Sequence, residues 1–256
     1  YFLLMFINDF DPVAFNLFSL EIRWYSLSYI FGIILGWFYC KKFIIRDLKI
    51  SKIFDDLISY IIIGIIVGGR LGYVLFYNLE YYLNNLSEVI MIWKGGMSFH
   101  GALVGIILIV IFFSKKYKID KLIFLDLIAI SAPIGIFFGR ISNFINGELV
   151  GKTTNMYWGV VFPNIDNFSR HPSQLYEAFL EGLILFALMN LIYFKSNYKT
   201  GTCSFMFLIL YGAFRVLSEF FREPDVQIGY IFGWISMGML LSTIMIFAGI
   251  ILYFKK

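Results

Sequence analysis

Long apolar runs recur along this chain of 256 residues, separated by short polar segments. The runs are continuous rather than alternating with period two, and most approach the ~20 residues that an α-helix needs to cross a bilayer. Because lipid offers the backbone no hydrogen-bond partner, we expect each run to be a helix. The pattern predicts seven spans, over about Trp24–Cys40, Leu57–Tyr77, Met97–Phe113, Leu122–Phe138, Leu175–Phe194, Ser204–Phe221 and Tyr230–Phe254.

Composition supports this class of fold. Of all residues, 60% are hydrophobic and only 15% are charged, a balance that a soluble domain of this size does not need. With no internal repeat and no linker, we expect residues 1–256 to form one integral membrane domain with an all-α polytopic fold. The two longer connections, Asn78–Gly96 and Arg140–Gln174, predict a small head on one side of the membrane.

Lysines mark one side of the predicted bundle. Thirteen of the 21 basic residues follow spans one, three, five and seven, and twelve of the thirteen are Lys. Cytoplasmic loops carry such an excess of positive charge. With seven spans, the pattern predicts a periplasmic N-terminus, a cytoplasmic C-terminus and a periplasmic head. The set comprises Lys41, Lys42, Arg46, Lys49, Lys52, Lys115, Lys116, Lys118, Lys121, Lys195, Lys199, Lys255 and Lys256.

The other eight basic residues lie on the predicted outer side or within spans, and six of them are Arg. Either basic residue would serve as a topology signal, whereas planar, bidentate binding of phosphate or carboxylate favours Arg. The outer arginines therefore indicate a site for an anionic group. The eight are Arg23, Arg70, Lys94, Arg140, Lys152, Arg170, Arg215 and Arg222.

Span six carries a charged stripe. Arg215, Glu219 and Arg222 are spaced i, i+4 and i+7, so they share one face of a helix. An Arg in the centre of a bilayer costs about 2.5–3.5 kcal/mol on insertion scales, so this face should meet other helices or a polar cavity. Glu219 could serve an internal bridge that pins helices together, or a site.

The segment Gly139–Gly151 follows an apolar run and holds Arg140, Asn143, Asn146 and Glu148 within a few positions. A metal site does not suit it, since neither His nor a second carboxylate joins the group. A phosphate site does, because Arg supplies charge and the Asn amides supply directed donors.

Two further polar residues lie among glycines. His100 follows Gly95-Gly96 and precedes Gly101, where a substrate could approach closely, and its ordinary pKa near 6.5 would suit a general base. A structural His is the competing interpretation. Arg70 in span two could equally be structural or bind substrate. His171, beside a Pro-Ser helix start, is better explained as local structure.

These residues resemble a known family. The run Gly139–Leu149 is similar to the signature of bacterial prolipoprotein diacylglyceryl transferases, and other motifs match in the family's order along the whole chain. Ser142 and Ser26 stand where the family usually has Gly. The other matching segments are Phe10–Val13, Arg23–Tyr25, Gly69–Tyr73, Gly95–Gly101, His171–Glu177 and Glu219–Asp225.

The resemblance implies an activity: the diacylglyceryl group of phosphatidylglycerol moves to the lipobox cysteine thiol of a prolipoprotein, and glycerol phosphate leaves. It implies seven spans in the bacterial cytoplasmic (inner) membrane, membrane lipids and prolipoprotein signal peptides as partners, and no cofactor or metal. We expect a monomer. By position, Arg140 and Arg215 match the family's essential arginines. The other matched or neighbouring site residues are His100, Tyr25, Asn143, Asn146, Glu148, Arg70, Glu219 and Arg222.

We assign His100, Arg140 and Arg215 to catalysis and the remainder, together with Arg140, to substrate binding. Two rival functions are weighed against this one. A lipid or anion transporter would place polar groups in both leaflets and show symmetric halves, and neither pattern is present. A non-catalytic scaffold leaves His100 among glycines unexplained. Nothing suggests a nucleic-acid partner, a nucleotide site, a Ser-His-Asp triad or a zinc cluster.

Overall fold

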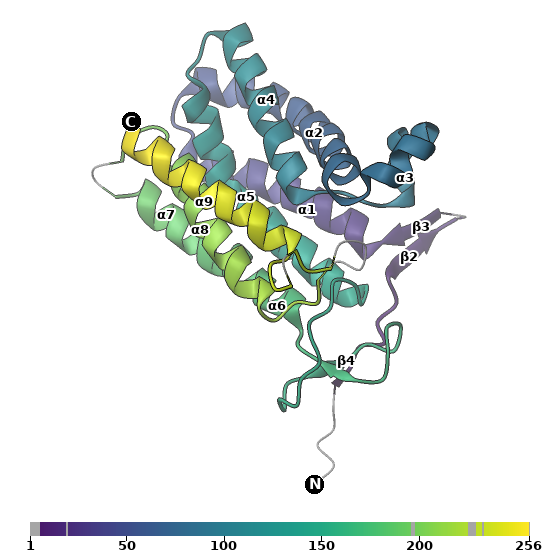
Figure 1. Cartoon of the computed structure of the whole chain (residues 1–256). Coiled ribbons are helices and arrows are strands. Elements are labelled where there is room, and N and C mark those ends of the chain that lie inside the picture. The colour runs from purple at the N-terminus through teal and green to yellow at the C-terminus, as the bar shows by residue number, and fades with distance from the viewer. Residues whose placement is uncertain (1–5, 19, 196–197, 225–228, 232, 256) are drawn as a thin grey trace.

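Seven long helices form the bulk of the molecule (Figure 1). The computed structural model describes residues 6–18, 20–195, 198–224, 229–231 and 233–255. Within these residues, seven helices are long and apolar enough to cross a membrane, which confirms the predicted all-α polytopic fold. They are α1 (Trp24–Tyr39, continued by the π-helix η1, Cys40–Ile44), α2 (Leu48–Tyr77), α4 (Phe99–Tyr117), α5 (Lys121–Ile145), the continuous helix α6–η4–α7 (Ser173–Glu177, Ala178–Ile184, Leu185–Tyr193), α8 (Thr202–Glu219) and α9 (Met237–Lys255).

The predicted start of the second span was wrong. α2 begins at Leu48 rather than Leu57, because the side chain of Asp47 accepts a hydrogen bond from the backbone N of Lys49 and starts the helix there. Its first turns are charged, so hydropathy alone places the boundary at the edge of the apolar run instead.

The predicted start of the seventh span was also wrong. α9 begins at Met237 rather than Tyr230. Gly229 and Gly233 both have positive φ, a conformation that ends a helical run, and a turn at Gly233–Trp234 precedes the helix. Asp225, the last residue of one family-like motif, lies outside the described residues.

Helices pair most closely where glycines face each other. A Cβ added to Gly72 of α2 would lie 2.5 Å from the Cα of Gly101 on α4, and one added to Gly105 would lie 2.1 Å from the carbonyl O of Gly64. Backbone therefore meets backbone along this pair, which is how helices associate in lipid. α1 and α5 approach similarly at Gly32, where an added Cβ would lie 2.7 Å from the facing backbone.

A small head with short strands covers one end of the bundle. β1 (Phe6–Ile7) runs parallel to β4 (Val160–Val161), which pairs antiparallel with β5 (Ser169–Arg170). The hairpin of β2 (Val13–Leu17) and β3 (Leu20–Arg23) leads into α1. The connection from α2 to α4 contains α3 (Leu79–Asn84) and two 3-10 turns (Leu86–Ile90 and Ile92–Lys94).

In Figure 1 the strands gather at the end of the bundle opposite the C-terminus. We call this the head end, and we call the end that bears the loops with Lys41, Lys116 and Lys195 the lysine-rich end. A small head was predicted from the two long connections and is confirmed. That it lies in the periplasm stays a prediction.

A buried carboxylate organises the lysine-rich end. Asp126 of α5 is 2% exposed and accepts a hydrogen bond from the backbone N of Ser204 at 2.7 Å, with others from the backbone N of Gly201 and the hydroxyl of Tyr198. It satisfies N–H groups that the first turn of α8 would otherwise leave free. Nearby Cys203 is buried, and its thiol lies 4.0 Å from the backbone O of Met189.

Candidate active site

Two arginines and two glutamates form a buried ionic cluster. The Nη1 atom of Arg140 lies 2.8 Å from Oε2 of Glu177, and Nη2 of Arg140 donates to Oε2 of Glu181 at 3.0 Å. Nη1 of Arg215 lies 2.7 Å from Oε1 of Glu177 and 3.6 Å from Oε1 of Glu181. Both glutamates are 0% exposed. Charges at this depth persist because they pair with one another.

The elements that carry these residues differ from the predicted ones. α5 continues past the expected end at Phe138 to Ile145, so Arg140 stands on a helix and not in a loop. Glu177 closes α6, and Glu181 lies in the π-helix η4. π-helical turns are rare and often occur at functional sites. Here the π-helical turn follows Glu177 and contains Glu181, and both carboxylates contact the guanidiniums of Arg140 and Arg215.

The predicted polar face of span six joins the cluster. Nη2 of Arg215 donates to Oε1 of Glu219 on the same helix. The placement of Arg222 on that helix face was wrong, because α8 ends at Glu219 and Arg222 forms a β-bridge with Gly151. Its Nη1 nevertheless lies 3.5 Å from the same oxygen of Glu219. The hydroxyl of Ser236 donates to Oε2 of Glu219 at 2.7 Å. Three arginines thus meet three glutamates, so their formal charges cancel. The sequence left open whether Glu219 forms an internal bridge or belongs to a site, and the structure shows the bridge, to Arg215.

The predicted residues after Arg140 lie together. Nδ2 of Asn143 donates to Oε1 of Glu148 at 2.8 Å, and Nδ2 of Asn146 donates to the same oxygen at 3.3 Å. The side chain of Gln174 donates to the backbone O of Glu148 at 2.7 Å. Two amides and a fixed backbone therefore orient one exposed carboxylate. The hydroxyl of Ser142, one of the departures from the family pattern, donates to the backbone O of Trp24 at 3.1 Å.

A cavity of about 690 Å³ lies beside the cluster, between α1, α2, α4, α5, α8 and the end of α9. Its wall is largely apolar, but Arg140, Asn143 and Tyr25 line it at the head end. Glu177 and Glu181 do not line it, so they stand behind the arginine as seen from the cavity. The guanidinium has five N–H donors, and the two glutamates use only part of them. Such a wall can hold an anionic headgroup while apolar tails lie in the same cavity.

Two aromatic side chains extend the wall. Tyr25 accepts a hydrogen bond from the hydroxyl of Tyr29 at 3.0 Å. Tyr211, one turn before Arg215 on α8, lines the cavity and stacks on Phe99 with ring centroids 4.3 Å apart. The phenol of Tyr211 therefore adds a polar group to the cavity wall, on the same helix as Arg215.

His100 lies at the start of α4, outside the cavity wall. Its Nε2 is 3.3 Å from the hydroxyl of Ser242 on α9, and it lies within electrostatic range of Arg215. The structure thus places it near Arg215 but not in the wall of the cavity. Its role as a base stays a prediction.

Arg70 is the one predicted site residue that the described contacts place elsewhere. Its Nε donates to the backbone O of Val89 at 2.9 Å and its Nη2 to that of Glu88 at 2.7 Å, while Nη1 donates to Gly95. The guanidinium also lies 5.0 Å from the ring centre of Tyr82. These contacts tie down the connection between α2 and α4, and they favour the structural interpretation of Arg70.

His171 also has a local role. Its Nδ1 lies 3.1 Å from the hydroxyl of Tyr176, which accepts a hydrogen bond from the indole N–H of Trp158 at 2.7 Å. Burial, and then the positive charge of Lys152, lowers the pKa of His171 below its ordinary value. This chain of contacts holds the head against the start of α6, in agreement with the structural assignment made from the sequence.

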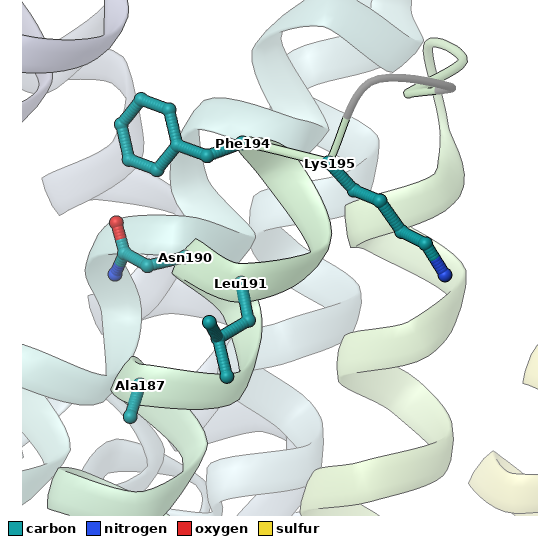
Figure 2. Close-up of a pocket in the computed structure, with 5 residues that line it drawn as sticks. All are labelled: Ala187, Asn190, Leu191, Phe194 and Lys195. Atoms are coloured by element: carbon teal, nitrogen blue, oxygen red, sulfur yellow. The ribbon is translucent and has the colours of Figure 1, made fainter.

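A second hollow, of about 430 Å³, lies on α7 near the lysine-rich end. Figure 2 shows its five lining residues, with Asn190 and Phe194 projecting from one side of the helix and Lys195 from another. Asn190 is engaged, since it donates to the backbone O of Phe186 and accepts from Tyr39. The five lining residues include no carboxylate and no nucleophile.

Sequence reasoning missed the most buried members of the site. Glu177 ends the family-like segment His171–Glu177, but the sequence analysis assigns no role to Glu177 or to Glu181. Two carboxylates four positions apart inside an apolar span were the available signal, since such residues are rare there and mark function. Tyr211, four residues before Arg215, was missed too. Among the described residues no three His, Cys, Asp or Glu side chains are grouped to hold a metal ion.

Comparison with known proteins agrees with this geometry. The model of the family "Prolipoprotein diacylglyceryl transferase" matches residues 12–255. Proteins named phosphatidylglycerol–prolipoprotein diacylglyceryl transferase are similar over nearly the whole chain. One from Ehrlichia canis (strain Jake) is 52% identical over 250 residues, covering 96% of this chain and 95% of its own. One from Ehrlichia ruminantium (strain Welgevonden) is 51% identical over 246 residues (94% and 95%), and one from Rickettsia bellii (strain OSU 85-389) is 49% identical over 251 residues (96% and 95%). The chain belongs to the prolipoprotein diacylglyceryl transferase family.

Proposed function

We propose that this protein transfers the diacylglyceryl group of phosphatidylglycerol to the lipobox cysteine of prolipoproteins, the first step of lipoprotein maturation. The observation that carries the proposal is Arg140, whose guanidinium lines an apolar cavity while buried Glu177 and Glu181 hold it from behind. A phospholipid has the matching form, an anionic phosphate above apolar chains. The names of the relatives support the same activity.

The reaction is a displacement at carbon. The cysteine sulfur forms a bond to the glycerol carbon of the diacylglyceryl group, the bond from that carbon to the phosphate oxygen breaks, and glycerol phosphate departs with the electron pair. The thiol proton passes to a base, since only the thiolate is a good nucleophile. Negative charge grows on the departing phosphate, where preorganised guanidiniums stabilise it most.

Each predicted residue has a place in this scheme. Arg140 and Arg215 stabilise the phosphate, and His100 takes the thiol proton. Asn143, Asn146 and Glu148 fix the glycerol headgroup, beside Tyr25 in the cavity wall. Glu219 holds Arg215 in position from α8 itself, and Arg222, which follows the end of that helix, pairs with the same carboxylate. For Arg70 the contacts favour support of the α2–α4 connection over binding of substrate.

The protein works in the bacterial cytoplasmic membrane, with the head on the periplasmic side where a translocated lipobox cysteine arrives. The excess of lysine at the other end supports this orientation. One chain supplies every residue of the cluster and the cavity, so we propose that the active form is a monomer.

The direct test reconstitutes the protein in phosphatidylglycerol vesicles with a lipobox peptide and detects the thioether product by mass spectrometry. The wild type should form diacylglyceryl peptide, and Arg140→Ala should lower the rate at least about 100-fold, as does removal of one oxyanion-binding donor. Arg46→Ala is the matched control, because Arg46 is exposed at the lysine-rich end, away from the cluster.

The outcomes separate two claims. No product from a folded wild-type protein would overturn the proposed activity. Product from Arg140→Ala at the wild-type rate would keep the activity and overturn the role of Arg140. His100→Gln tests the base in the same assay: an unchanged rate between about pH 6 and 8 would assign His100 to structure.

A further inference from the structure

The cavity beside Arg140 is much longer than the site needs. Along α5 its wall follows one stripe from Leu122 through Leu125, Ala132 and Gly139 to Asn143. At a rise of 1.5 Å per residue this stripe is about 31 Å long, which equals the ~30 Å hydrocarbon thickness of a bilayer. The cavity therefore extends through both leaflets, although the ionic cluster lies at one end.

Five other helices line the half of the cavity near the lysine-rich end. The lining residues there are Phe54 and Ile58 from the first turns of α2, Ile111 from the later turns of α4, Trp37 from the end of α1, Phe205 from the start of α8 and Leu252 from the end of α9. Six helices, α5 included, therefore reach this depth. All six of these side chains are apolar or aromatic, so this half suits hydrocarbon.

The lining decides what kind of occupant fits. The cavity has a volume of about 690 Å³, an arginine at one end and a largely apolar wall along the rest of its length. Flexible acyl chains below an anionic headgroup match both this lining and this length.

The depth of the cavity can be compared with the length of an acyl chain. An outer-leaflet lipid with its phosphate at Arg140 reaches the bilayer centre after about 15 Å, near Ile130 on α5. The wall continues beyond that level to Leu122. Ser131 lies in the wall near the midplane, but its hydroxyl donates to the backbone O of Leu127 on its own helix at 2.9 Å. Lys121 and Ser204 add polar groups only at the far end, so an acyl chain that passes the midplane meets one hydroxyl, whose proton is already shared within α5.

We propose that the half of this cavity near the lysine-rich end, the inner half, selects the donor lipid by the length of its acyl chains. The distance from Arg140 to the far end of the cavity then sets the longest acyl chain that is accepted. The proposal rests on the proposed function only for the identity of the lipid, an acidic phospholipid bound at Arg140. A bulky side chain placed in the cavity should shorten the longest chain that fits, and it should do so more strongly when it lies nearer Arg140.

Three variants test this. Ile111→Trp fills the inner half, and Ala132→Phe fills the cavity about 12 Å from Arg140 along α5. Phe112→Trp is the matched control, because Phe112 neighbours Ile111 at the same depth but is 58% exposed on the outward surface.

The readout is lipid binding, which does not require activity. Each protein is incubated with equal amounts of didecanoyl, dimyristoyl and distearoyl phosphatidylglycerol in detergent, and bound lipids are counted by native mass spectrometry. Ile111→Trp should lower the distearoyl-to-didecanoyl ratio about tenfold, the usual scale of an overpacked cavity. Ala132→Phe should lower the dimyristoyl ratio as well, and Phe112→Trp should match the wild type.

Equal ratios in the wild type and both cavity variants, all with unchanged melting temperatures, would overturn the proposal. Equal shifts in Phe112→Trp would also overturn it, since the effect would not come from the cavity. The transfer assay is run on the same samples. If the cavity variants change the ratio of bound long-chain to short-chain lipid but no protein transfers diacylglyceryl, the selection of acyl chains by the cavity is supported and the proposed activity is rejected.

Discussion

Arg140 lies 2.8 Å from the carboxylate of Glu177, and this carboxylate is completely buried and also meets Arg215. The two arginines are therefore held at a fixed separation by one side chain between them. Preorganisation of this kind is what stabilises charge that develops during a reaction, because the donors need not move when it forms.

Replacing Glu177 should destabilise the fold as well as the site. Glu177→Gln leaves two guanidiniums short of one buried countercharge, and breaking such pairs costs about 3–5 kcal/mol. We expect a lower melting temperature in detergent, measured by calorimetry or intrinsic fluorescence, together with loss of transfer. The control is Glu21→Gln at an exposed pair, which should leave the melting temperature unchanged. A Glu177→Gln protein as stable as the wild type would contradict the structural role of the pair.

Arg70→Ala should loosen the connection between α2 and α4. Its guanidinium binds backbone carbonyls at Glu88 and Val89 and stacks on Tyr82, so its loss frees the segment 86–96. Hydrogen exchange in that segment should quicken, and Arg70→Lys should not restore protection because an ammonium cannot reproduce the fork of donors. Unchanged exchange with a raised KM for lipid would instead assign Arg70 to substrate binding.

The glycines of the α2–α4 contact should not tolerate a methyl group. A Cβ at Gly105 would lie 2.1 Å from the carbonyl O of Gly64, so Gly105→Ala must force these helices apart. We expect a clear fall in melting temperature. Gly139→Ala is the control in α5, where an added Cβ meets nothing within 4 Å; helix propensity predicts a gain of up to about 1 kcal/mol. The opposite ranking would contradict the close contact.

His171 should make the fold less stable in mild acid. Burial and Lys152 lower its pKa in the folded protein, so the unfolded chain, with an ordinary pKa near 6.5, binds the proton first as pH falls. Stability is therefore intact above about pH 7 and decreases from about pH 6.5 downward. NMR titration of His171 in a His100→Gln background should give a midpoint below 6.5, and Lys152→Met should raise it. A midpoint above 6.5 would refute the assignment.

The sequence alone predicted the spans well because hydrocarbon demands long apolar helices whatever their neighbours are. It also singled out Arg140, Arg215, Asn143 and Glu148, since polar groups near a membrane are costly enough to mark function. The structure places them in or near the ionic cluster, and their roles stay predictions. The boundaries were less accurate. At Leu48 a capping side chain started the helix before the apolar run, and at Arg140 the helix continued beyond it.

The contact partners of the buried charged residues and the depth of the cavity were decided by the tertiary structure. Nothing local in the sequence indicates that Glu177 and Glu181 stand behind Arg140, because their pairing joins α5 with the α6–η4 helix across the bundle. The same holds for Arg70, whose donors are used by a loop that folds back on it. Periodicity records which positions are apolar, but the depth of the cavity depends on how six helices pack around it. That packing leaves a deep, largely apolar space beside Arg140, and no single helix contains that information.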